Sequence, residues 1–213
     1  RVFVTASMGV ALFPSDAGSA EDLIRHAETA RDDAKGRRSH AYTFFTDNLV
    51  QEAEQRLRLE NDLRHALQRD ELQMYYQPQV DLQTGRVVGL EALLRWNHAD
   101  HGFVAPGRFI PLAEQSGLIV ELDRWVLHHV LQQAHEWSKA GLPPVRISLN
   151  LSAVSFREAA PYELLATALA ATGADPSQLE LEITESTVMA STEHSVRVLD
   201  RIRNLGVRVA VDD

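Results

Sequence analysis

The chain has 213 residues, of which 45% are hydrophobic and 24% are charged, as in a globular protein of one or two domains. It contains no cysteine, which excludes a disulfide scaffold and thiolate metal sites. The formal net charge of −9 argues against a nonspecific nucleic-acid surface, and no apolar run approaches the roughly 18 residues of a membrane span. We therefore expect no DNA or RNA partner and no membrane segment within this chain.

The N-terminal part of the chain predicts one strand and two helices. Residue 1 is Arg rather than Met, so we expect an interior piece of a longer protein. An apolar strand is predicted over Val4–Pro14 and a helix over Asp22–Lys35. A second helical run follows Thr46 and continues to Asp70, with a stripe of leucines among charged residues. We interpret it as a solvated connecting helix; a signalling or dimer helix is the alternative.

Downstream, strands alternate with helices. The predicted strands are Leu72–Val80, Val87–Trp96, Val145–Ser152, Leu179–Thr184 and Val207–Asp213. The predicted helices are Asp123–Ala140, Pro161–Thr172 and His194–Leu205, each closed by a glycine that favours a left-handed C-terminal residue. A short turn at Thr84-Gly85 makes the first two strands antiparallel. The strand–helix alternation makes the other strands parallel and covers one face of the sheet with helices.

The uncovered face of this sheet is predicted to be polar. Alternation with period two places Glu91 and Arg95 on one face of their strand, with Asn150, Glu182 and Asp212 on the polar faces of the next three. The ordinary alternatives are an internal Glu91–Arg95 ion pair and a half-exposed antiparallel sheet. We favour a sheet that curves into a barrel, where polar side chains point inward and the C-terminal strand ends carry the chemistry.

These side chains predict a metal site. Three carboxylates and an amide oxygen that converge would repel one another without a cation, and oxygen-only ligands favour hard divalent ions such as magnesium, manganese or calcium. The adjacent pair Asp212-Asp213 suits two ions held close together, the usual arrangement for in-line cleavage of phosphodiesters. A transition-metal site built from histidines is less favoured, because the adjacent His128 and His129 point apart on a helix.

Six motifs occur in order over residues 71–213. They are Tyr76-Gln77-Pro78-Gln79, Glu91-Ala92-Leu93-Leu94-Arg95-Trp96, Phe109-Ile110-Pro111-Leu112-Ala113-Glu114, Asn150-Leu151-Ser152, Leu181-Glu182-Ile183-Thr184-Glu185 and Val211-Asp212-Asp213. Together they resemble the EAL-type cyclic di-GMP phosphodiesterases, named for the tripeptide that stands here at residues 91–93. The resemblance implies an α/β fold that forms the first part of a TIM-like (β/α)8 barrel with an antiparallel first strand pair.

The resemblance also implies the activity and the roles of the site residues. The reaction would be metal-dependent hydrolysis of cyclic di-GMP to linear pGpG in bacterial second-messenger signalling. The implied metal ligands are Glu91, Asn150, Glu182, Asp212 and Asp213. Gln77 and Arg95 would contact the substrate, and Glu185 would support the loop after the Asp-Asp pair. The cofactor would be a pair of Mg²⁺ or Mn²⁺ ions, with Ca²⁺ inhibitory.

The same resemblance divides the chain into three parts. Residues 1–46 resemble the C-terminal tail of a GGDEF (diguanylate cyclase-like) domain, residues 47–70 would form a linker helix, and residues 71–213 would form the N-terminal part of an EAL domain. We expect a cytoplasmic homodimer formed through the EAL domain or the linker helix, with any membrane anchor upstream. A polypeptide that ended at Asp213 is expected to be inactive. The alternative function is a degenerate EAL domain that acts as a non-catalytic cyclic di-GMP receptor or scaffold.

Overall fold

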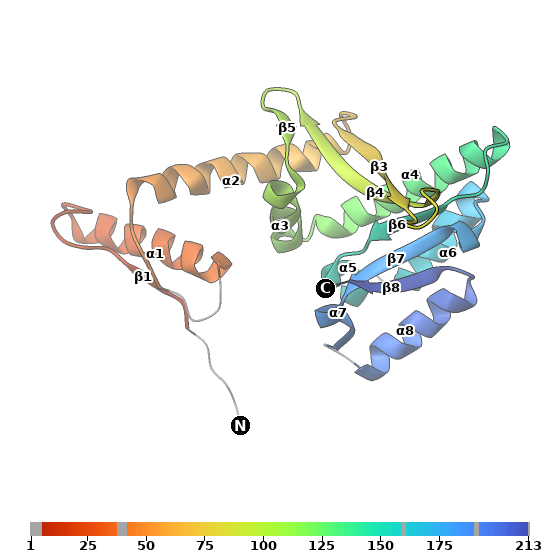
Figure 1. The fold of residues 1–213 in the computed structure, drawn as a ribbon. Coiled ribbons are helices and arrows are strands. Elements are labelled where there is room, and N and C mark those ends of the chain that lie inside the picture. Colours follow the sequence, from red (N-terminus) through yellow and green to blue (C-terminus); the bar gives the residue numbers. More distant parts are fainter. Residues whose placement is uncertain (1–5, 38–41, 159–160, 190–191, 213) are drawn as a thin grey trace. The chain divides into compact units, whose positions relative to one another are not determined.

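The computed structural model describes residues 6–37, 42–158, 161–189 and 192–212 (Figure 1). It contains two compact units, Arg1–Asn61 and Asp62–Asp213. The division falls inside helix α2 (Asp47–Ala66), which corresponds to the predicted connecting helix. The prediction that this helix reaches Asp70 is wrong, because Asp70 has a φ of +54° and turns the chain toward the next strand.

The first unit is a small parallel strand pair covered by a helix. Strand β1 (Met8–Val10) pairs with β2 (Tyr42–Phe44), and helix α1 is Ala20–Arg37. The strand predicted to extend to Pro14 ends at Val10, because the side chain of Asp16 accepts from Leu12 N at 2.6 Å and folds the following residues into a turn. Residues 4 and 5 of that prediction lie outside the described residues, and β2 was not predicted.

The second unit contains a six-stranded sheet (Figure 1). In spatial order its main strands are β3 (Leu72–Val80), β4 (Val87–His98), β6 (Arg146–Asn150), β7 (Leu179–Thr184) and β8 (Arg208–Asp212), while β5 (Gly102–Val104) pairs with β4. The antiparallel β3–β4 pair and the parallel order of β4, β6, β7 and β8 confirm the predicted strand directions.

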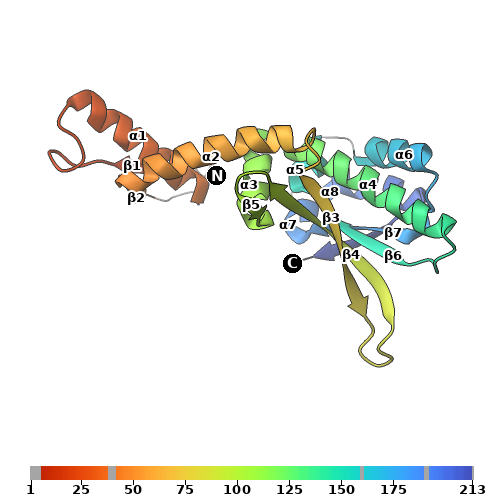
Figure 2. The same cartoon turned by 90° about the horizontal axis from the view of Figure 1, so that it is seen from above.

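Helices cover one face of this sheet, as Figures 1 and 2 show. They are α4 (Ile119–Lys139), α6 (Pro161–Thr172) and α8 (Thr192–Asn204). The glycines that follow them, Gly141, Gly173 and Gly206, all have positive φ values, as predicted. The apolar residues of the strands and helices form one core on this side. Within the described ranges, none of the helices is both long enough and apolar enough to cross a bilayer.

Several short elements were not predicted. They are β5, α3 (Pro106–Ser116), α5 (Ala153–Glu158), the 3-10 helix η1 (Pro176–Gln178) and α7 (Glu185–Met189). The start predicted for α4 at Asp123 is also wrong, because the helix begins at Ile119, two residues after the left-handed Gly117 that ends α3. Pro111 lies inside α3, and because proline disfavours the interior of a helix, local propensity does not predict a helix here.

Candidate functional site

The register of the parallel strands aligns the predicted site residues on the face away from the helices. Asn150 of β6 lies opposite Glu182 of β7, and Glu91 of β4 lies opposite Ser148. Asp212 is two positions beyond the residue of β8 that faces Glu182, so it lies at the end of the sheet. This end holds the C-termini of the parallel strands.

Direct contacts and charge link four of these residues. Asn150 Nδ2 donates to Glu91 Oε1 at 3.2 Å. Burial raises the pKa of Glu182, and repulsion from Glu91 and Asp212 raises it further, while a hydrogen bond from Ser148 acts in the opposite direction. Glu91 and Asp212 therefore lie close enough to Glu182 to disfavour its ionisation.

The donor set suits a hard divalent cation. Its donors are carboxylate and amide oxygens, and Glu91 and Asp212 add to the effect of burial on the pKa of Glu182 by a repulsion that a cation would offset. In the ranges that the structure describes, no three His, Asp or Glu side chains are already close enough to enclose an ion. Asp213, the fifth predicted ligand, lies outside the described residues.

The remaining predicted residues surround this group. Arg95 and Glu91 both lie in the described part of the chain, and they form no ion pair with each other. The Nη1 of Arg95 instead donates to Leu94 O at 3.0 Å, and the Arg95 guanidinium lies 5.7 Å from the centre of the Tyr75 ring. Gln77 is exposed on β3, directly opposite Glu91 in the antiparallel register. Glu185 is the exposed first residue of α7, just after β7 ends.

A cleft of about 480 Å³ opens beside these residues. Its polar lining includes Arg95, Asn150 and Glu182, and its apolar lining comes from the end of β4 and from α3 and α4. This combination of an apolar wall with a few convergent polar groups is typical of small-molecule sites, and the volume lies within their usual range. The cleft is therefore the candidate binding site.

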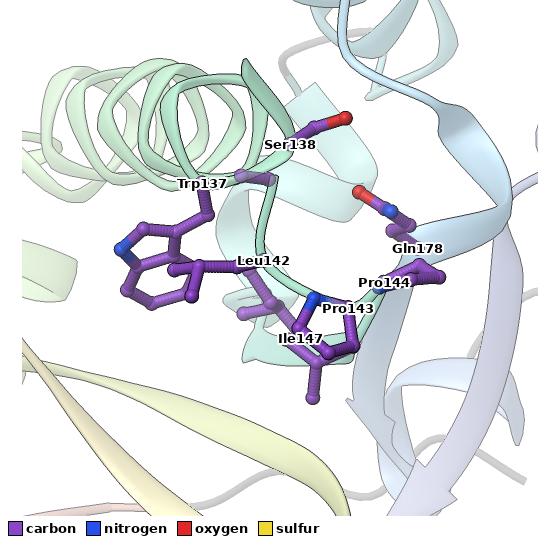
Figure 3. A pocket seen from close by; sticks show the side chains of 9 residues that line it. Trp137, Ser138, Leu142, Pro143, Pro144, Ile147 and Gln178 are labelled. Atoms are coloured by element: carbon purple, nitrogen blue, oxygen red, sulfur yellow. The ribbon is translucent and has the colours of Figure 1, made fainter. Parts of the chain in front are cut away.

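A second cavity, shown in Figure 3, does not fit this role. It has a volume of about 10 Å³ and is lined by Trp137, Leu142, Pro144 and Gln178, among others. These residues belong to α4 or precede β6 and β7, so they lie at the opposite ends of the strands from the candidate site. A space of this size holds about one water molecule.

Asp123 is a cleft residue that our sequence analysis did not single out. Its Oδ2 accepts from Ser152 N at 3.2 Å and from Ser152 Oγ at 2.6 Å, so it anchors the loop that follows Asn150. Burial raises the pKa of Asp123, and Glu114 adds repulsion. The signal that could have revealed it is a carboxylate among the core-facing positions of an amphipathic helix, next to the buried Leu122.

The buried carboxylate of Asp123 predicts a pH-dependent effect of Asp123→Asn. The folded-state pKa lies above the unfolded value of about 3.9, so ionisation of Asp123 costs stability as the pH rises through the folded pKa. The asparagine keeps an oxygen that can accept from Ser152 but does not ionise. We expect the variant to gain stability relative to the wild type between about pH 4 and pH 7. Urea unfolding of both proteins measures this difference.

Asp81→Asn is a control because Asp81 should affect the pH dependence of stability in the opposite direction to Asp123. Asp81 is exposed in the β3–β4 turn, and hydrogen bonds from the side chain and backbone of Thr84 hold its pKa below the usual range. The contribution of the ionised Asp81 carboxylate to folding stability is present at neutral pH and is lost as the pH falls through the lowered pKa. For Asp123→Asn, a free-energy difference from the wild type that was the same at about pH 4 and at about pH 7 would contradict the explanation by burial.

Comparison with known proteins gives consistent matches. Residues 60–213 match the EAL domain family. The chain is 39% identical over 213 residues to the bifunctional diguanylate cyclase/cyclic di-GMP phosphodiesterase MucR of Pseudomonas aeruginosa, over 100% of this chain and 31% of MucR. It is 37% identical over 210 residues to the cyclic di-GMP phosphodiesterase NbdA of the same organism, over 99% of this chain and 27% of NbdA.

The fold has a similar match among solved structures. A structure of the PaMucR phosphodiesterase in complex with c-di-GMP superposes with a TM-score of 0.70 at 42% identity, over 73% of this chain and 63% of that chain. The present chain spans less than a third of the length of MucR and of NbdA.

Proposed function

The chain belongs to the EAL domain family, and from this membership we propose that it hydrolyses cyclic di-GMP to linear pGpG in bacterial second-messenger signalling. The observation that carries the proposal is the group of oxygen donors on the polar face of β4, β6 and β7. Glu91, Asn150 and Glu182 meet there, beside a cleft of suitable size for a nucleotide.

We assign the residues of this group the following roles. Glu91, Asn150, Glu182 and Asp212 would hold one divalent cation, and Asp212 with Asp213 would hold a second. Bound Mg²⁺ or Mn²⁺ would polarise the phosphodiester and lower the pKa of water. Arg95 would hold a substrate phosphate by a charge-assisted hydrogen bond, Gln77 would contact the substrate, and Glu185 would support the loop after Asp213.

The proposed reaction opens the dinucleotide ring. A water oxygen forms a bond to one phosphorus, the bond from that phosphorus to O3′ breaks, and a proton is transferred to the O3′ leaving group. The product is the linear dinucleotide with one terminal phosphate. The apolar wall of the cleft would exclude bulk water from the reacting phosphate and strengthen its interaction with Arg95.

The finer architecture is part of the same proposal. The parallel order of β4, β6, β7 and β8 supports the first part of a TIM-like (β/α)8 barrel. The match of the whole chain to a relative named as bifunctional supports the interpretation of residues 1–46 as the tail of a GGDEF domain. The homodimer and the cytoplasmic location stay predictions.

The test is turnover by the protein that contains residues 1–213. We expect conversion of cyclic di-GMP to pGpG in Mg²⁺ or Mn²⁺, and binding without conversion in Ca²⁺, whose larger size and flexible coordination do not suit the transition state. Chromatography measures the product, and titration calorimetry measures binding. Binding without turnover in every ion would contradict the enzyme and indicate a receptor, whereas no binding at all would indicate a scaffold.

A further inference from the structure

Beneath the oxygen donors, three polar side chains form a connected network. Arg146 Nη2 donates to Gln79 Oε1 at 3.3 Å, and Gln79 Nε2 donates to Ser148 Oγ at 3.4 Å. Ser148 is fully buried, and it lies on the same face of the sheet as Glu182 of the neighbouring strand β7, near enough for its hydroxyl to oppose the rise in the pKa of Glu182. The network therefore joins β3 to β6 and ends beside a carboxylate of the proposed metal site on β7.

Donor and acceptor chemistry fixes the direction of each bond in this network. An arginine side chain has donors only, so Arg146 must face the carbonyl oxygen of Gln79. The NH₂ group of Gln79 is then left to face Ser148, whose oxygen accepts. A serine hydroxyl has a single proton, and a carboxylate can only accept, so the Ser148 proton is available for the nearby Glu182.

The first residue of the network, Arg146, is itself held in place. Its Nη1 lies 3.5 Å from Glu180 Oε2. In the strand register Arg146 lies beside Gly89 of β4. A Cβ at Gly89 would lie 2.6 Å from Gln79 Oε1 and 3.4 Å from the Arg146 guanidinium nitrogens, so the glycine leaves the space in which the two side chains meet.

We infer that Arg146, Gln79 and Ser148 are positioning residues that orient the Glu182 carboxylate for a divalent cation. The inference rests on the proposed function, because it requires Glu182 to be a metal ligand. Side chains that hydrogen-bond to metal ligands typically contribute about 10- to 100-fold to metal affinity, because they fix the orientation of the ligand. In this role the Ser148 hydroxyl would donate to one acceptor position of Glu182 and leave the others for the cation.

Ser148→Ala tests the inference in the protein that contains residues 1–213. The variant is expected to bind Mn²⁺ at least about 10-fold more weakly than the wild type, measured by titration calorimetry without nucleotide. Ser195→Ala is the matched control, because it removes the same hydroxyl group from another buried serine, on α8, and it should leave Mn²⁺ affinity unchanged. Circular dichroism verifies that both variants are folded. Equal affinity of Ser148→Ala and the wild type would overturn the inference.

A double-mutant cycle tests the order of the network. Gln79→Met removes the amide at similar length and should also weaken Mn²⁺ binding. Because Gln79 acts through Ser148, it should have no further effect in the Ser148→Ala background, and additive effects would contradict the proposed order. A wild-type protein that binds no Mn²⁺ would overturn the proposed metal site together with this inference, whereas wild-type binding with an unaffected Ser148→Ala would overturn the inference alone.

Discussion

Replacing Glu91 with alanine is expected to lower metal-dependent hydrolysis of cyclic di-GMP by at least ~10³-fold. Glu91 accepts from Asn150 and interacts electrostatically with Glu182, so its loss removes a proposed metal ligand from the centre of the site. Metal-ion catalysis contributes several kcal/mol, and each ~1.4 kcal/mol corresponds to tenfold in rate. The measurement is kcat for pGpG formation at saturating Mg²⁺ and substrate.

Glu163→Ala is the matched control for the loss of a glutamate. Glu163 lies on α6, and its exposed carboxylate pairs with Arg201 at 2.8 Å, away from the polar face of the sheet. An exposed ion pair of this kind contributes little to stability, so the variant should remain folded and active. If Glu91→Ala kept a rate close to that of Glu163→Ala, the assignment of Glu91 as a metal ligand would be refuted.

Replacing Trp96 with alanine is expected to lower the free energy of unfolding by about 3–5 kcal/mol, the usual cost of truncating a fully buried large aromatic side chain. Trp96 has no exposed surface and packs edge-to-face on Phe109 of α3, with ring centres 5.6 Å apart. Its Nε1 donates to Glu71 Oε2 at 2.9 Å, just before β3 begins. Urea unfolding of the wild type and the variant measures the loss.

Trp96→Phe separates the hydrogen bond from the packing. The phenyl ring retains much of the contact with Phe109, but the buried carboxylate of Glu71 loses its donor, which costs about 1–3 kcal/mol. Glu71→Gln keeps an acceptor oxygen for the indole and should therefore cost less than Trp96→Phe. A Trp96→Phe protein as stable as the wild type would show that the bond to Glu71 contributes nothing.

Local patterns in the sequence were sufficient for the main elements. Alternation with period two identified β4, β6, β7 and β8, and each amphipathic helix between them was predicted with its closing glycine. These patterns depend on residues only two to four positions apart, which is why they can be recognised without a structure. Among the elements that were missed, the three-residue β5 is too short for a repeat and depends on pairing with β4, and α3 has a proline, Pro111, inside its helical pattern.

The sequence by itself determined which residues share the polar face: Glu91, Asn150, Glu182 and Asp212 follow from alternation within each strand. Only the tertiary structure decided which of these side chains touch. It excluded the Glu91–Arg95 pair, set Asn150 against Glu91, and brought Gln79 to Ser148 across 69 residues of chain. The reason is physical: a strand's own sequence fixes the side to which each side chain points, whereas contacts between strands depend on register and on the space that residues such as Gly89 leave.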